Sequence, residues 1–253
     1  MNAEPEPSAP SIEWYVERLL EDADNFAIVL DSGGGQAEVG GCPGWNVKRL
    51  ASHLGDVHRW AAYCAANSKP PESRDEFRMP AEAEPGVWLR AGASALAEVL
   101  LKVDPDAPTW HPFPVERVAR VWPRRQAQET SMHRWDAQSA TGTAAAIDPA
   151  LASDGIDEYF TIFAARVMKR QEITSLPGSL HVHCTDIAGE WLAWTDDHGF
   201  HLERAHQKAD AALRGPAEAL LLRLWGRTSP RADELQPIGD ESVLNAWLAI
   251  GGQ

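Results

Sequence analysis

Cysteine is scarce in this sequence of 253 residues, which has three: Cys42, Cys64 and Cys184. They lie far apart and show neither the paired spacing of a disulfide framework nor the spacing of a thiolate zinc site. The sequence therefore argues against both kinds of scaffold. A reducing compartment suits such a chain best, so we expect a cytoplasmic protein.

Positive charge and long apolar runs are also in short supply. The chain has 23 Lys and Arg residues against 37 Asp and Glu, a formal net charge of -14. Because binding of phosphate groups needs clustered Lys and Arg, nucleic acid is not expected as the main partner.

No stretch is long and apolar enough to predict a membrane span. The first ten residues, Met1 to Pro10, have no apolar core, which predicts a disordered leader and not a signal peptide.

Four amphipathic helices are predicted in the first half of the chain. Ser11 and Asn46 are suited to cap the first two helices, and Pro85 is suited to the first turn of the third. The fourth begins near Trp122 and ends at Thr141, before a glycine. Four such helices joined by loops favour a helical bundle, and side chains on facing helices of bundles often assemble metal sites.

The second half changes from helical to alternating periodicity. Asp148 followed by Pro149 predicts the start of another helix. Hairpin-connected strands are then predicted at 179–185, 190–195 and 200–203, followed by helices at 217–225 and 243–250. The second half is therefore expected to be α+β, with an antiparallel sheet covered by helices.

The stretch from Trp122 to Ala137 carries a carboxylate and an imidazole one helical turn apart. Glu129 and His133 are separated by four residues, so a helix places them on one face, where they could bind one metal ion. Pairs of this kind are also common on solvent-exposed helix faces, and the spacing alone favours that interpretation. The pair needs further ligands from elsewhere in the chain.

The roles expected for the other histidines depend on the residues around them. His53 lies beside the apolar position Leu50 on the inward side of its predicted helix, whereas His58 is turned roughly half a circle away. A single histidine on an apolar face is usually a hydrogen-bonded core residue. His181 and His183 share one face of a predicted strand, but with no matching carboxylate or third imidazole apparent we expect an exposed or pocket-lining pair. Three further histidines are expected at the surface: His198, His201 and His206.

The chain contains the stretches Pro43 to Gly55, Arg124 to Asp136, His181 to Trp191 and Lys208 to Arg227. Together they resemble the mycothiol-dependent maleylpyruvate isomerase family. Its N-terminal half belongs to the DinB-like metal-binding bundles and its C-terminal half is similar to sterol-carrier-type folds. The resemblance covers nearly the whole chain after Ser11.

This resemblance implies a DinB-like four-helix bundle over residues 11–146 and a smaller sterol-carrier-like α/β domain with an antiparallel sheet over residues 147–253. It also implies that His53, Glu129 and His133 are the three protein ligands of a divalent metal. Two imidazoles and one carboxylate suit zinc and leave open positions, although nickel, iron or manganese could bind the same set.

The implied cofactors are this metal and mycothiol. A thiol at an open metal position has a lowered pKa, so a thiolate forms at neutral pH without a cysteine of the protein. In the implied chemistry the thiolate adds to the cis double bond of a maleylpyruvate-like keto diacid, the new single bond rotates, and elimination gives the trans alkene. Asp136, one turn after His133, is a candidate for orienting that ligand, with a surface carboxylate as the alternative.

The resemblance assigns catalytic roles to Arg227 and Arg223, whose guanidinium groups would hold substrate carboxylates. The alternatives are a basic helix end that complements the helix dipole, or a surface salt bridge. Two other functions also stay open. The eleven tryptophans favour a mycothiol S-transferase with a bulkier acceptor, and a non-catalytic small-molecule-binding protein would use the same fold. We expect a monomer or homodimer, with a small-molecule electrophile and a low-molecular-weight thiol as partners.

Overall fold

A computed structural model of the protein describes residues 10–251. Of the predicted disordered leader, all but Pro10 lies outside the described residues. The chain forms two compact units, one of residues up to His111 together with 117–145, the other of 112–116 together with the residues from Ala146 onward. The predicted domain limits, 11–146 and 147–253, stay a prediction about which parts fold on their own. No helix within the described range is long and apolar enough to cross a membrane.

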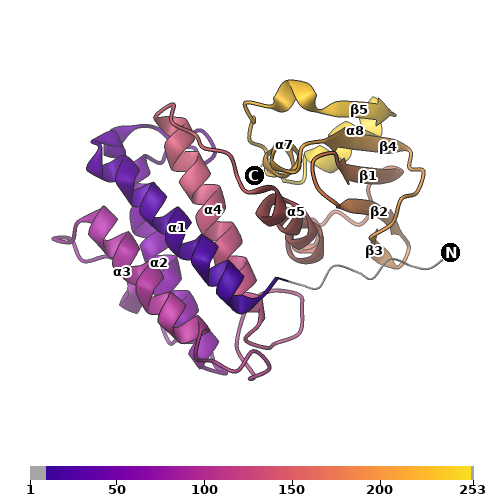
Figure 1. Ribbon diagram of the computed structural model, residues 1–253. Coiled ribbons are helices and arrows are strands. Elements are labelled where there is room, and N and C mark those ends of the chain that lie inside the picture. Colours follow the sequence, from indigo (N-terminus) through magenta and orange to yellow (C-terminus); the bar gives the residue numbers. More distant parts are fainter. Residues whose placement is uncertain (1–9, 252–253) are drawn as a thin grey trace. The chain divides into compact units, whose positions relative to one another are not determined.

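Four long helices build the first unit (Figure 1). They are α1 (Ile12–Asp31), α2 (Val47–Ala66), α3 (Pro85–Leu100) and α4 (Val121–Ala140), with the short 3-10 turns η1 (Gly34–Gln36) and η2 (Asp75–Phe77) between them. The Ser11 side chain accepts a hydrogen bond from the Trp14 N–H, and that of Asn46 accepts one from the Arg49 N–H, which confirms both predicted N-caps. Pro85 stands in the first turn of α3, where its missing N–H costs nothing.

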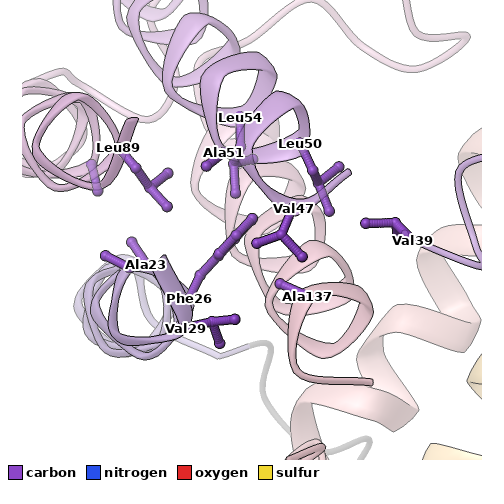
Figure 2. Close-up of a cluster of buried hydrophobic side chains, with 12 residues drawn as sticks. Ala23, Phe26, Val29, Val39, Val47, Leu50, Ala51, Leu54, Leu89 and Ala137 are labelled. Carbon is purple, nitrogen blue, oxygen red and sulfur yellow. The ribbon is translucent and has the colours of Figure 1, made fainter. Parts of the chain in front are cut away.

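The core of this unit is apolar and joins all four helices. Figure 2 shows Phe26 of α1 extending toward Ala51 and Val47 of α2, and these residues share one buried cluster with Ala137 of α4. Leu50 of α2 and Leu89 of α3 are fully buried in the same cluster. Burying each large apolar side chain contributes about 1.5–3 kcal/mol. The core therefore fixes α2 and α4 against each other, and these two helices carry the candidate metal ligands.

A five-stranded sheet with the order β3-β2-β1-β4-β5 forms the second unit. Its strands are β1 (Ser179–Cys184), β2 (Glu190–Asp196), β3 (Gly199–Glu203), β4 (Ala211–Gly215) and β5 (Gln236–Gly239). The helical segments of this unit are α5 (Pro149–Glu158), the π-helix η3 (Tyr159–Ala164), α6 (Ala165–Arg170), α7 (Ala217–Leu224), the 3-10 turn η4 (Ala232–Glu234) and α8 (Glu241–Leu248). Helices α7 and α8 both contact β1 and β4, and α5 packs on α7.

The predicted fold class, a helical bundle followed by a smaller unit with an antiparallel sheet, is confirmed. Three of the four strand pairings are antiparallel, whereas β1 and β4 run parallel, which the sequence did not predict. Strands β4 and β5 were not predicted either. The first is short and built partly of alanine and glycine, and the second contains Pro237 and ends at Gly239. Such residues have low strand propensity, so neither segment shows clear alternation.

Candidate metal centre

His53, Glu129 and His133 come together from two neighbouring helices. Helix α2 carries His53, and α4 carries Glu129 and His133 one turn apart. One ligand atom from each residue lies within 4.8 Å of the others. All three residues are partly exposed. The helical spacing predicts the pair on α4, and the packing of α2 against α4 adds the third residue.

Glu129 lies between a guanidinium and an imidazole. Its Oε2 accepts a hydrogen bond of 2.9 Å from Nη2 of Arg125, and its Oε1 lies 3.4 Å from Nε2 of His133. Burial alone would raise the pKa of the Glu129 carboxyl, but the hydrogen bond and charge of His133 and the charge of Arg125 outweigh it and hold the pKa well below its usual range. The carboxylate is therefore ionised at neutral pH, as a metal ligand must be.

His133 is oriented by a second carboxylate. Its Nδ1 lies 3.1 Å from Oδ2 of Asp136, which leaves Nε2 on the side of Glu129. Asp136 is 2% exposed, so the alternative of a surface carboxylate is wrong. Burial alone would lower the pKa of His133, but the hydrogen bond to Asp136 and the contacts with Cys42 and Glu129 hold it well above its usual range. A metal ion would therefore displace a proton on binding.

His53 completes the group from α2. Its ring centroid lies 6.1 Å from that of His133 and 5.0 Å from that of Trp45, both in edge-to-face arrangements. Burial lowers the pKa of His53, which keeps the ring neutral and able to bind a metal. Cys42 and Asp136 form a second possible ligand group with His133. Because Asp136 lies at Nδ1, that group would use the opposite edge of the ring.

Replacing Asp136 by asparagine is expected to weaken metal binding about 10–100-fold, because partners that orient ligand histidines contribute this much to affinity. The change keeps the size of the side chain but removes the charge that favours the Nε2 side of His133 for the metal. Competition with a chelator measures the affinity. Asp75→Asn, at a carboxylate that is 71% exposed, is the control and should bind normally. Equal affinity in both variants would show that Asp136 does not orient the ligand.

The position of His58 differs from the prediction, which turned it away from the inward side of α2. It is fully buried, because α2 packs against α3 as well as α4 and is covered on two faces. Its Nε2 lies 2.9 Å from Oγ1 of Thr130, and that hydroxyl donates to the Gln126 carbonyl at 2.7 Å. Since the Thr130 proton is used there, Nε2 of His58 must be the donor. Burial lowers the pKa of His58 to about 3.

Acid is expected to destabilise the bundle through His58. Its folded pKa of about 3 lies below the usual value of 6.5, so between these values the unfolded state binds more protons. The contribution is complete above pH 6.5 and is lost as the pH falls toward 3, and by pH 4 the loss amounts to about 3 kcal/mol. Urea unfolding of metal-free protein at pH 7 and pH 4 measures it. His58→Gln should lose less stability between these pH values, and an equal loss would contradict the assignment.

Arg223 and Arg227 lie at the end of α7. Gly226, with φ 72°, ends the helix, and the Arg227 N–H donates to the Leu222 carbonyl at 2.7 Å. Nη1 of Arg227 donates to the Trp225 carbonyl at 2.8 Å. A guanidinium that binds a helix-end carbonyl is the arrangement that complements the helix dipole. The carboxylate-binding role of both arginines stays a prediction.

In the second unit, the surroundings of His181 and His183 differ from the prediction. Glu190 and His206 join His181 and His183, and one ligand atom from each of the four lies within 4.8 Å of the others. The expectation of no matching carboxylate or third imidazole is therefore wrong. Glu190 lies opposite His183 in the pairing of β1 with β2, so the predicted hairpin could have indicated this neighbour. No local spacing could have indicated His206.

Comparison with known proteins places the chain in a family. The sequence model for the mycothiol maleylpyruvate isomerase N-terminal domain matches residues 16–138, and that for the MDMPI C-terminal domain matches residues 150–246. No curated protein matches the chain.

Three solved structures are similar to the chain. Crystal structures of a mutant and of the unaltered mycothiol-dependent maleylpyruvate isomerase match with TM-scores of 0.61 and 0.59 and identities of 11% and 12%; each comparison covers 90% of this chain and 93% of the other. A UbiJ-SCP2 ubiquinone synthesis protein matches 41% of this chain and 90% of its own, with 20% identity and a TM-score of 0.31. The isomerase structures share the fold, and the two domain matches extend over most of the sequence. The chain therefore belongs to the mycothiol maleylpyruvate isomerase family.

Proposed function

We propose that the protein is a cytoplasmic enzyme that uses mycothiol and a divalent metal ion, nominally to isomerise a maleylpyruvate-like keto diacid from cis to trans. The observation that carries this proposal is the meeting of His53, Glu129 and His133 within 4.8 Å on two packed helices. Membership of the family supports mycothiol as the thiol and a small molecule as the substrate.

The donor set fits a catalytic divalent ion. Two imidazoles and a carboxylate are a common set for zinc, and three protein ligands leave a position for a further group. Nickel, iron and manganese also bind such donors. Arg125 holds one oxygen of Glu129 and Asp136 holds one nitrogen of His133, so the ligand side chains are fixed before any substrate arrives. We propose zinc as the metal.

The chain's buried cysteines are poor sources of a thiolate. Burial raises the pKa of Cys64 and of Cys184 to about 12, so both stay protonated at neutral pH. A bound divalent ion would lower the pKa of an added thiol and so supply the nucleophile. This division of roles supports an external thiol as the reactive group.

Arg227 and Arg223 are proposed to hold the substrate carboxylates. A guanidinium binds a carboxylate through two parallel hydrogen bonds, and such charged hydrogen bonds contribute about 1.5–3 kcal/mol each. Replacing Arg227 by alanine should therefore lower isomerisation by at least about tenfold. Arg231→Ala, which removes an arginine of the same unit that pairs with Glu234, should leave it unchanged.

Incubation of the metal-loaded protein with maleylpyruvate and a catalytic amount of mycothiol tests the reaction. Formation of the trans isomer over many turnovers, with mycothiol recovered, supports the isomerase. Failure to form it, together with stoichiometric conjugates of other electrophiles that are unchanged in Arg227→Ala, would contradict both the isomerase and the arginine roles.

An S-transferase is the second candidate. Trp45 packs against His53 with its ring centroid at 5.0 Å, which places an aromatic surface directly beside the proposed metal. Such a surface suits a bulky apolar acceptor better than a small diacid. Stable mycothiol conjugates in the same incubation would identify this activity. Absence of any mycothiol binding would favour a non-catalytic binding protein.

A further inference from the structure

Four potential metal ligands meet on one face of the sheet of the second unit. They are His181, His183, Glu190 and His206, and one ligand atom from each lies within 4.8 Å of the others. The three rings lie 5.6–6.0 Å apart between centroids, all in edge-to-face arrangements. None of these residues belongs to the candidate metal centre of α2 and α4. The group therefore needs an explanation of its own.

Strand register explains how the group forms. His181 and His183 are two residues apart on β1, so they project from the same face. Glu190 lies directly opposite His183 on β2, which places its carboxylate on that face as well. His206 follows β3 and reaches back to the group, with its Nδ1 at 2.6 Å from Oε2 of Glu190. Two neighbouring strands thus supply three rigidly placed donors, and the segment after β3 supplies the fourth.

His181 lacks a polar partner that its burial demands. It is 7% exposed, and its Nε2 is fully buried and has no hydrogen-bond partner among the described residues. Oε2 of Glu190 lies 3.5 Å away, beyond a good hydrogen-bond distance. A buried ring nitrogen without a partner costs about 1–3 kcal/mol. Such a cost is removed if the nitrogen binds an ion at the centre of the group.

Glu190 is placed to share its carboxylate among the three histidines. Oε1 lies 3.1 Å from Nδ1 of His183, while Oε2 lies near both His181 and His206. Ligands around a tetrahedral zinc ion, with bonds of about 2.0–2.1 Å, are about 3.3 Å apart. The separations of 3.1 Å to His183 and 3.5 Å to His181 are close to this spacing, whereas the 2.6 Å to His206 is a hydrogen-bond distance that would lengthen when an ion binds.

We propose that His181, His183, Glu190 and His206 form a second divalent-metal site, of the type that binds zinc. Four protein ligands fill a tetrahedral shell, so the ion has a structural and not a catalytic role. The His206 side chain is 78% exposed and lies in the connection between β3 and β4. The ion therefore clamps this connection onto β1 and β2.

A hollow lies on the same face of the sheet as the group. A shallow hollow of about 480 Å³ opens over the same unit and is lined by Leu192, Trp194 and Glu203, among others. Leu192 is the residue paired with His181 across the β1–β2 ladder, so its side chain lies on the same face of the sheet as the histidine group. The alternative to a metal site is a cluster of histidines that share Glu190 by hydrogen bonding alone.

Metal stoichiometry of the full-length protein separates these possibilities. Metal-depleted protein is incubated with zinc, desalted and analysed for bound metal. A His53→Ala/His133→Ala variant, which lacks the first centre, should still retain about one zinc per chain. Adding His181→Ala and His183→Ala to it should remove that zinc. His201→Ala on the same background is the control, since His201 binds Asp196 outside the group, and it should keep the metal.

A single substitution at an exposed ligand separates loss of metal binding from loss of folding. Because His206 is exposed, His206→Ala should leave the core of the unit intact while weakening zinc binding at this site at least about tenfold. Zinc should also raise the melting temperature of the His53→Ala/His133→Ala variant, and this shift should shrink in the presence of His206→Ala. Absence of bound zinc in the folded His53→Ala/His133→Ala variant, or zinc binding indifferent to His206→Ala, would overturn the proposal.

Discussion

Alanine in place of His133 or of His53 is expected to remove the metal of the first centre and to lower the thiol-dependent activity by more than about 100-fold. Loss of an orienting partner already costs 10–100-fold in metal affinity or activity, so loss of a direct ligand should cost more. Two remaining donors cannot hold a catalytic ion tightly, since such sites use three protein ligands. His53 stands on α2 and His133 on α4, so each variant tests the contribution of a different helix.

The second proposed metal site requires a defined background for this test. In a protein that carries His181→Ala and His183→Ala, bound zinc should be about one equivalent and should fall to near zero when His53→Ala or His133→Ala is added. Elemental analysis measures the zinc, and circular dichroism checks that the helices persist. His201→Ala is the matched histidine control. Full retention of zinc in both ligand variants would refute the assignment of these residues.

Replacing Arg134 by methionine is expected to destabilise the bundle by about 3–5 kcal/mol, because it leaves a buried carboxylate without its counter-charge. Arg134 is 4% exposed, and its Nε donates to Oδ1 of Asp22 at 2.9 Å, which joins α4 to α1. Its Nη1 donates to Gln138 and to the Ala145 carbonyl. Burial raises the pKa of Asp22 against the opposing charge of Arg134, so the unpaired carboxyl would tend to take up a proton.

A double-mutant cycle separates this ion pair from simple packing. Asp22→Asn combined with Arg134→Met should be markedly more stable than Arg134→Met alone, since no buried charge is left unpaired. Denaturant unfolding of the metal-free chain at pH 7 gives the free energies. If the two single variants and the double variant were additive, the pair would contribute nothing specific.

Local signals in the sequence predicted most of the helical elements. Ser11, Asn46 and Asp148 each accept hydrogen bonds from the first turn of a helix, as their positions before apolar periodic runs indicated. Such caps involve residues only a few positions apart, so a local sequence pattern can predict them. The parallel pairing of β1 with β4 depends on contacts about 30 residues apart and on the neighbouring strands, and no local pattern encodes it.

The candidate centre was predictable to different degrees for its different residues. Glu129 and His133 follow from helical spacing, whereas the placement of His53 beside them followed only from a family resemblance and depends on how α2 packs on α4. The burial of His58 was missed because periodicity describes one apolar face, and α2 is covered on two. His206 is exposed, as predicted, but its contact with Glu190 forms only in the folded sheet, so no local pattern predicts it.

Addition of mycothiol to protein loaded with one equivalent of cobalt(II) tests the central claim most directly. The protein should carry His181→Ala and His183→Ala, so that cobalt fills only the centre of His53, Glu129 and His133. Cobalt(II) in such a site is coloured, and a thiolate bound to it gives an intense sulfur-to-metal charge-transfer band. The account predicts that this band appears at one mycothiol per cobalt near neutral pH and is absent when His133→Ala is added. A cobalt spectrum that does not change with excess mycothiol would contradict it.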